Sequence, residues 1–292
     1  MYMVVLHSIN RNQILAINTM EGSKNNTMVL AGSIILAGLL IAVGVFVANR
    51  DLPEDTVKED GGDTSTVALL LPAVTEKDHI IGSIDASIVL VEYSDTECPF
   101  CKNFHDVLNE IMVDYKDGNE LAWVYRHFPL ASLHPKAATE AHATECAYEL
   151  GGESAFWAYI NRLYEVTPSN NGLDLNELPK IAEYVGLDVD AFNQCQKDGK
   201  YKTAIQESYQ GAIKAGGNGT PFNIFVLKEK MNDSVMKAMK DLQSQFRPGS
   251  LLISDDGKRV AISGGLPKEG VVSFVDIFLG KNPVADESTP TE

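Results

Sequence analysis

The hydrophobic pattern divides the chain into an apolar span near the N-terminus, a polar stretch, and a long region of strand-like and helix-like signals. Residues 28–48 contain no charged side chain, and a helix of about 20 apolar residues crosses the roughly 30 Å hydrocarbon core of a bilayer. Residues 50–66 are acidic and almost free of large apolar side chains, which is typical of flexible tethers. We therefore predict a short cytoplasmic segment at 1–27, a transmembrane anchor at 28–48 and an acidic flexible linker at 49–72.

A cleaved signal peptide is the alternative interpretation of the apolar span. The span is longer than the usual apolar region of a signal peptide, about 7–15 residues. Phe46 also stands where a cleavage site ending at Ala48 requires a small residue. We favour the anchor. Its orientation does not follow from charge, because Arg11 and Lys24 before the span are balanced by two basic residues shortly after it.

Residues 73–280 carry the pattern of one folded α/β domain, and residues 281–292 indicate a disordered tail. Short apolar runs predict buried strands, and apolar residues three and four positions apart predict amphipathic helices. Between about 137 and 215 the signal is helical throughout. The predicted strands are 88–93, 121–128, 222–227 and 259–263, and the predicted flanking helices are 99–116 and 267–280.

Two signals mark a helix inside the long helical stretch. Asp174, followed three residues later by Glu177, resembles a capping box, which begins a helix. Gly186 is placed to end the same helix, because glycine readily adopts the left-handed conformation found there.

Two cysteines flank the dipeptide Pro99-Phe100, between a predicted strand and a predicted helix. A cysteine at a helix N-terminus lies beside unpaired backbone N–H groups and the positive end of the helix dipole, and both favour the thiolate. Such surroundings lower a thiol pKa from about 8.5 into the range of about 3.5–7.5. We therefore predict a redox-active Cys98–Cys101 disulfide in which Cys98 is the exposed attacking sulfur and Cys101 is the resolving sulfur.

A zinc site is the alternative for the CxxC, because half of a four-cysteine site has the same spacing. The chain has four cysteines, at 98, 101, 146 and 195, without a second CxxC, so we expect neither a metal nor a cofactor. A formal net charge of −16 argues against nucleic acid as a partner.

Three stretches carry a family resemblance. They are residues 93–101 (YSDTECPFC), residues 125–135, which begin YRHFPL and end HP, and residues 219–221 (GTP). With the order of predicted elements, they make residues 75–280 resemble the DsbA-like thiol–disulfide oxidoreductases. The resemblance implies a thioredoxin-like α/β fold with an inserted helical domain at about 137–215, preceded here by one transmembrane helix.

The chain departs from that family at 228–253, where related chains have a short turn. Apolar residues at helical spacing predict an amphipathic helix in this insertion; they are Met231, Val235, Met239, Leu242 and Phe246. We expect the helix to pack over the sheet edge. A contact with a partner is the alternative, since methionine-rich faces recur at adaptable binding surfaces.

The resemblance also assigns roles to residues outside the CxxC. It implies that the Thr220–Pro221 bond is cis and lies against the cysteines, where the missing N–H of Pro221 leaves neighbouring backbone free to pair with a substrate. It further implies a structural disulfide between Cys146 and Cys195. From the residues alone, two buried free thiols are the alternative; a disulfide would contribute roughly 4 kcal/mol by closing the loop.

Three histidines are further candidates for chemistry. His105 follows Cys101 by one helical turn and would tune the thiolate if it faces the sulfurs. His127 and His134 are expected to hold the loop after the second strand. A structural or surface role is the default for each.

These features predict a membrane-tethered, extracytoplasmic thiol–disulfide oxidoreductase. We expect a monomer that oxidises reduced exported proteins and is reoxidised by a membrane redox partner. Disulfide chemistry requires a compartment outside the cytoplasm, which orients the anchor. A reductase or isomerase is one alternative, because Thr220 before Pro221 resembles those enzymes. A non-catalytic binding or assembly protein with structural disulfides is the alternative from another class.

Overall fold

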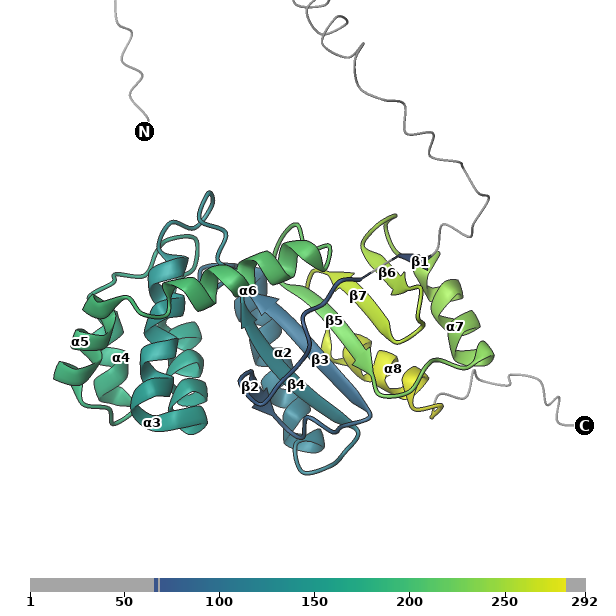
Figure 1. Cartoon of the computed structure of the whole chain (residues 1–292), viewed down its shortest axis with the longest axis horizontal. Helices are drawn as coiled ribbons and strands as arrows, with labels where there is room; N and C mark the ends of the chain where they lie inside the picture. Colours follow the sequence, from purple (N-terminus) through teal and green to yellow (C-terminus); the bar gives the residue numbers. More distant parts are fainter. Residues whose placement is uncertain (1–65, 68, 282–292) are drawn as a thin grey trace, which may run out of the picture. The chain divides into compact units, whose positions relative to one another are not determined.

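Seven strands form one mixed sheet in the part of the chain that the structure describes (Figure 1). The computed structural model describes residues 66–67 and 69–281, which belong to the second of two units of the chain, residues 63–292. The predicted N-terminal segment, the anchor at 28–48, most of the predicted linker and the tail at 282–292 lie outside the described residues. Within 66–67 and 69–281, no helix has both the length and the apolar character needed to cross a membrane.

The centre of the sheet is β3 (Ile88–Ser94), whose seven residues are all buried. It pairs in parallel with β4 (Leu121–His127) and antiparallel with β5 (Phe222–Leu227). Strands that are covered on both faces read as continuous apolar runs, which is why the sequence predicted all three. The complete strand order is β1-β6-β7-β5-β3-β4-β2.

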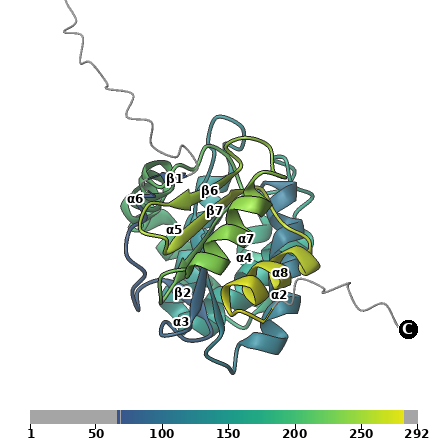
Figure 2. The same cartoon turned by 90° about the vertical axis from the view of Figure 1, so that its right-hand side faces the viewer.

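Helices cover both faces of this sheet (Figure 2). The first face carries α2 (Pro99–Tyr115), α7 (Asp233–Gln243) and α8 (Lys268–Phe278), and the second carries α6 (Lys202–Lys214). Because side chains alternate along a strand, Leu90 enters the core under the first face and Val91 the core under the second. The end of β3 is thereby fixed from both sides, and that end leads directly into the cysteine pair.

The inserted helices have a core of their own beside the sheet (Figure 1). They are α3 (Ala137–Val166), α4 (Glu177–Tyr184) and α5 (Val189–Asp198). The Asp188 carboxylate caps α5 by accepting the Ala191 N–H at 2.9 Å, and Gly199 ends the helix with a φ of +62°. From there α6 carries the chain back to the sheet.

The folded part begins earlier than the sequence predicts. β1 (Thr66–Val67) lies inside the predicted linker and pairs with β6 (Leu251–Ser254), and Leu69 is buried in the core under the second face. The edge strand β2 (His79–Ile81) was also not predicted. The strands β1, β2 and β6 each have four residues or fewer. Such short segments are difficult to recognise from a periodic pattern of apolar residues.

The stretch 228–253 contains a helix and part of a strand. α7 buries Val235 and Met239 against the core, as predicted for an amphipathic helix. The helix ends at Gln243, and the last residues of the stretch belong to β6, which the sequence did not predict and which forms an antiparallel hairpin with β7 (Arg259–Ser263). The buried apolar residues of this stretch therefore pack against the core of the same chain, as expected for a helix over the sheet edge.

The predicted capping box at α4 was wrong. Asp174 Oδ1 accepts the backbone N–H of Asn176 at 3.0 Å, and α4 has no side-chain cap. The carboxylate thus stabilises a turn before the helix. Gly186 does end the helix, with a φ of +80°, as predicted.

Candidate active site

The cysteine pair lies where β3 ends and α2 begins. Cys98 is the N-cap residue of α2, with extended backbone, and Pro99 occupies the first helical position. The backbone of the turn is closed by the Cys98 N–H, which donates to the Asp95 carbonyl at 3.1 Å. The strand–CxxC–helix arrangement expected from the sequence is present, and both cysteines are free thiols in this structure.

The two sulfurs differ in their surroundings. Cys98 is 5% exposed, whereas Cys101 is completely buried, so the expected exposed sulfur is only the more accessible of two largely buried ones. Cys98 Sγ donates to the Thr220 carbonyl at 3.5 Å, and Cys101 Sγ accepts the Asp95 N–H at 3.5 Å. Phe100 projects outward and is 69% exposed. It presents an apolar side chain beside the thiols.

These surroundings separate the two thiol pKa values. The pKa of Cys98 is lowered to about 6, chiefly by a hydrogen bond from the Cys101 thiol. Burial opposes this shift, while hydrogen bonds from Thr220 and the N–H groups of Cys101 and Phe100 support it. Burial raises the pKa of Cys101 well above its ordinary value, and the nearby Cys98 and Glu92 raise it further. Only Cys98 is therefore a thiolate near neutral pH.

The loop before β5 brings the third element to the site. The Thr220–Pro221 peptide bond is cis, and the Thr220 carbonyl lies against Cys98. The Thr220 hydroxyl oxygen is buried and has no hydrogen-bond partner among the described residues in this dithiol form. It is therefore available to donate to the Cys98 thiolate.

A buried carboxyl group lies behind the resolving cysteine. Glu92 is completely buried in β3, where its two oxygens accept from Ser94 Oγ at 2.7 Å and from Trp123 Nε1 at 3.0 Å. Burial raises the pKa of Glu92 to about 7 despite these bonds. Its charge in turn raises the pKa of Cys101. The sequence reading missed this residue, although a single carboxylate inside an otherwise apolar strand was the available signal.

The histidines serve the framework of the site. His105 Nε2 donates to Asn161 Oδ1 at 2.7 Å, and the ring packs against Trp123. Burial lowers the pKa of His105 to about 4, so the ring stays neutral, and its hydrogen bond is made to Asn161 and not to a sulfur. His134 Nδ1 lies 3.0 Å from Asp95 Oδ2, which holds the loop after β4 against the turn before Cys98. His127 is directed to Glu145 on α3.

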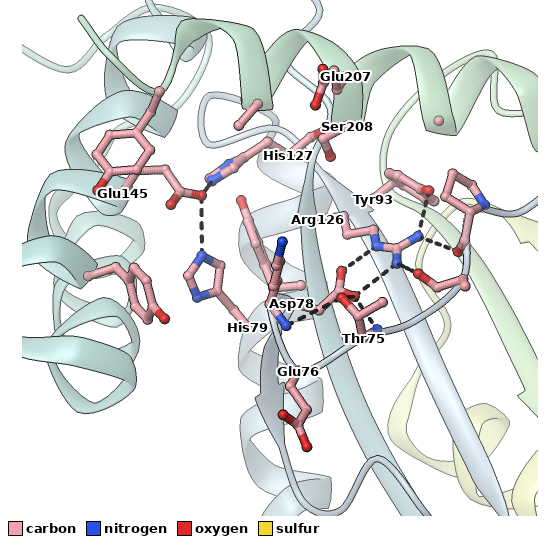
Figure 3. A pocket seen from close by; sticks show the side chains of 18 residues that line it. Thr75, Glu76, Asp78, His79, Tyr93, Arg126, His127, Glu145, Glu207 and Ser208 are labelled. Carbon is pink, nitrogen blue, oxygen red and sulfur yellow. Dashed lines mark hydrogen bonds and ion pairs between the residues drawn. The ribbon is translucent and has the colours of Figure 1, made fainter.

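A pocket lies away from the cysteines, between the sheet edge and the inserted helices (Figure 3). It has a volume of about 580 Å³, and no cysteine lines it. The Arg126 guanidinium binds Asp78 there at 2.6 Å, and His79 lies between Glu145 and Glu153. These ion pairs join β2 and the segment before it to β4 and α3.

The other two cysteines, Cys146 and Cys195, form a disulfide with an S–S distance of 2.03 Å. It links α3 to α5 in the core of the inserted helices and leaves the CxxC as the pair of free thiols among the four cysteines. Within the described part of the chain, no group of three or more histidine, cysteine or acidic side chains is arranged to hold a metal ion.

Comparisons with known proteins agree with this architecture. The family model described as thioredoxin matches residues 74–243. DsbA2 of Pseudomonas aeruginosa is 25% identical and superposes with a TM-score of 0.50, covering 73% of this chain and 98% of that chain. α-DsbA1 of Wolbachia pipientis shares the fold, with 24% identity and a TM-score of 0.54 over 73% of this chain and 95% of that chain.

Curated relatives with higher identity are much longer proteins. The Na⁺/H⁺ antiporter NhaA 1 of Mycolicibacterium vanbaalenii is 36% identical over 126 residues, which are 43% of this chain and 19% of that protein. The Na⁺/H⁺ antiporter NhaA 3 of Salinispora tropica is 32% identical over 165 residues, 55% of this chain and 23% of that protein. The chain thus spans about a fifth of the length of the curated relatives it matches.

A sheet flanked by helices, a dithiol at the start of α2 and a cis proline against it define a thioredoxin-fold protein of the thiol–disulfide oxidoreductase class. The family model covers more than half of the chain, so the protein belongs to the thioredoxin family. Its inserted helices and its structural relatives make it a DsbA-like member.

Proposed function

We propose that the protein is a membrane-tethered oxidoreductase that acts outside the cytoplasm and introduces disulfides into exported proteins. The observation that carries this proposal is the position of Cys98 at the N-cap of α2 and against the Thr220 carbonyl, with Cys101 completely buried beside it. These surroundings lower the pKa of Cys98 and raise that of Cys101. A stabilised Cys98 thiolate favours the reduced enzyme, and this makes the enzyme disulfide more oxidising.

The exchange begins with a substrate thiolate attacking the Cys98 sulfur of the oxidised enzyme. A bond forms between the substrate sulfur and Cys98, and the Cys98–Cys101 bond breaks. The second substrate thiolate then attacks its own partner sulfur, and Cys98 leaves as a thiolate while the substrate becomes a disulfide. Two electrons pass from the substrate to the enzyme, and a low thiol pKa makes Cys98 the better leaving group.

The Cys101 sulfur must gain a proton when the enzyme disulfide opens. Cys101 is buried away from solvent, so the proton has to come through a protein group. Glu92 suits this role because its pKa of about 7 lets it both hold and release a proton near neutral pH. Its carboxylate is fixed by Ser94 and Trp123, so it acts from a constant position.

Substrates are proposed to bind across the Thr220–Pro221 turn and the exposed Phe100. Pro221 offers no N–H, and an extended segment would pair with the neighbouring backbone. Phe100 would contact apolar side chains of an unfolded chain. The partners of this function are reduced exported proteins and a membrane redox protein that reoxidises the CxxC, with the protein itself acting as a monomer.

A reductase or isomerase is the second candidate, because Thr220 precedes the cis proline. A glutathione titration of the CxxC, paired with refolding of a reduced disulfide protein, distinguishes an enzyme that oxidises its substrates from one that reduces or isomerises them. We expect a potential well above that of a cytosolic reductant, about −270 mV, and faster oxidative refolding. A potential near −270 mV without any gain in refolding would show that the enzyme reduces disulfides instead.

Trapping experiments test the roles of the two cysteines. Cys101→Ser should accumulate mixed disulfides with substrates, since the resolving thiol is absent, whereas Cys98→Ser should not. A non-catalytic protein with structural disulfides would show neither trapping nor rapid exchange with mild dithiothreitol. If Cys98→Ser accumulated the mixed disulfides instead, Cys101 would be the attacking sulfur and Cys98 the resolving one.

The tether is tested by fractionation. The full chain should sediment with membranes through residues 28–48, and a chain beginning near Asp51 should be soluble and keep its thiol exchange. That start lies before β1, so no described element is removed. A mature N-terminus directly after Ala48 would replace the anchor by a cleaved signal peptide.

A further inference from the structure

Two buried carboxyl groups lie beside the nucleophilic cysteine and are not used by the exchange described above. Glu97 directly precedes Cys98, and Glu140 lies in the first turn of α3. Both residues are completely buried. Burial of two acidic side chains is costly unless hydrogen bonds or protons compensate, so their contacts need an explanation.

Each carboxyl group has one oxygen with a donor and one without. Glu97 Oε2 accepts the Asn171 N–H at 2.5 Å, and Glu140 Oε2 accepts the Thr96 hydroxyl at 2.7 Å. The Oε1 atoms of Glu97 and Glu140 are both buried, and no N–H or O–H of another described residue reaches them.

A proton on one of the two carboxyl groups would give both Oε1 atoms a hydrogen-bond partner. A carboxyl group donates to a carboxylate only when it is protonated, and two close carboxylates in a buried site raise the pKa of one of them. Burial, followed by a hydrogen bond with Glu97, raises the pKa of Glu140 to about 9. One hydrogen bond then connects the residue before Cys98 to α3.

Glu97 also binds an unusual turn. Ser169, Asn170 and Asn171 all have positive φ angles, of 62°, 54° and 64°, a left-handed conformation that is unfavourable for residues other than glycine and persists only where the surrounding structure holds it. Glu97 binds two of them, because its backbone carbonyl accepts the Asn170 N–H at 2.7 Å and its carboxylate accepts that of Asn171. The residue that binds the turn is therefore the one that directly precedes the nucleophile.

Other charged groups around the pair have partners of their own. Asp95 accepts from Glu97 N and lies 3.0 Å from His134. Lys136 Nζ donates to the Asn171 carbonyl at 2.7 Å, and Lys102 Nζ donates to the Thr167 carbonyl at 2.8 Å. From the helical core, the Tyr159 hydroxyl donates to the Leu178 carbonyl at 3.0 Å, so none of these groups donates to the two Oε1 atoms.

We propose that Glu97 and Glu140 share one proton and act as a positioning pair for Cys98. The shared proton keeps the turn at 169–171 and the N-cap of α2 fixed to α3, and it limits the pair to one negative charge beside a sulfur that must become a thiolate. Loss of the proton at high pH adds a second negative charge, which disfavours the Cys98 thiolate and makes the enzyme less oxidising. This inference rests on the proposed role of Cys98 as the reactive sulfur.

Glu140→Gln in the full chain isolates the shared proton. The amide keeps the shape, can donate to Glu97, and leaves a single carboxyl group in the pair. The glutathione equilibrium constant of the CxxC should match the wild type at pH 6. At pH 10 the variant should be more oxidising than the wild type on the order of tenfold, since only the wild type then carries two charges. Glu165→Gln, an exposed carboxylate on the same helix, is the matched control and should follow the wild type throughout.

Infrared spectroscopy supplies a second readout, and its main signal is measured on protein that keeps both Glu97 and Glu140. The wild type should show the C=O absorption of a protonated carboxyl group that persists above pH 8 and disappears as the pH rises through about 9; a Glu92→Gln background removes the signal of the other buried acid. Absence of this band, its persistence in Glu140→Gln, or an equilibrium ratio that is equal at pH 6 and pH 10 would overturn the inference. If Cys98 in the wild type does not react faster than Cys101 with iodoacetamide, the proposed function is wrong. This result is distinct from the outcomes above, which concern only the shared proton.

Discussion

Thr220→Val tests whether the Thr220 hydroxyl stabilises the Cys98 thiolate. The substitution removes a buried hydroxyl that has no other hydrogen-bond partner among the described residues, and it keeps both the side-chain shape and the backbone carbonyl that contacts Cys98. Lowering the Cys98 pKa from 9.0 to about 6 corresponds to roughly 4 kcal/mol in favour of the thiolate, at about 1.4 kcal/mol for each unit.

The share of Thr220 in that total can be bounded. A hydrogen bond to a charged group contributes about 1.5–3 kcal/mol, and the partial access of solvent to Cys98 favours a value at or below the lower limit. Because the Cys101 thiol contributes more than Thr220 does, we expect the Cys98 pKa to rise by about one unit in Thr220→Val. About 1.4 kcal/mol corresponds to a disulfide that is less oxidising by about 30 mV.

The assay is the rate of iodoacetamide alkylation of Cys98 in the reduced protein as a function of pH, with the modified peptide identified by mass spectrometry. A glutathione titration gives the potential of the same samples. Thr220→Ser keeps the hydroxyl and is the control. An unchanged alkylation midpoint in Thr220→Val, or an equal shift in Thr220→Ser, would refute the role assigned to the hydroxyl.

Three further predictions concern the buried acid, the second disulfide and the edge of the sheet. Glu92→Gln should slow thiol exchange by about 10²-fold, the lower end of the range of about 10²–10⁴ for general acid–base groups, and should abolish a titration near pH 7 in stopped-flow fluorescence; an unchanged pH profile would exclude Glu92 as the proton carrier. Replacing both Cys146 and Cys195 by alanine should lower the free energy of unfolding by roughly 4 kcal/mol, from closure of a loop of 49 residues, and should leave Cys98 alkylation unchanged; loss of the alkylation would mean that the disulfide also shapes the site. Burial lowers the pKa of His79, but Glu145 and Glu153 outweigh it and raise the pKa to about 9, so roughly 3 kcal/mol of stability should be fully present below pH 6.5 and be lost as the pH rises through 9. Urea unfolding of the wild type and His79→Gln between pH 6 and pH 10 measures this, and equal slopes with pH would contradict it.

The sequence determined the elements whose signals are local. The predicted limits of β5 and β7 agree with the structure, and those of β3 and α2 differ from it by one residue. Continuous apolar runs and helical spacing are properties of neighbouring residues, so they survive without knowledge of the fold. The position of Cys98 at a helix start follows from the same local information.

Short elements and their partners were decided by the tertiary structure. β1 has two residues and forms because β6, far along the chain, offers it an edge. Asp174 is a second case in which the sequence alone did not decide the local structure. Its position permits both a helix cap and a turn, and the folded protein contains the turn.

The chemistry of the site divides in the same way. The chain by itself identifies two cysteines at a helix N-terminus, and helix geometry predicts that one of them is reactive. The separation of their pKa values arises only after folding buries Cys101 against Glu92 and brings Thr220, 122 residues away, to Cys98. Glu97 and Glu140 likewise become a pair only when α3 packs beside the turn before the cysteines. The physical reason is that burial and hydrogen bonding set a pKa, and both depend on groups that the folded chain brings together from distant positions.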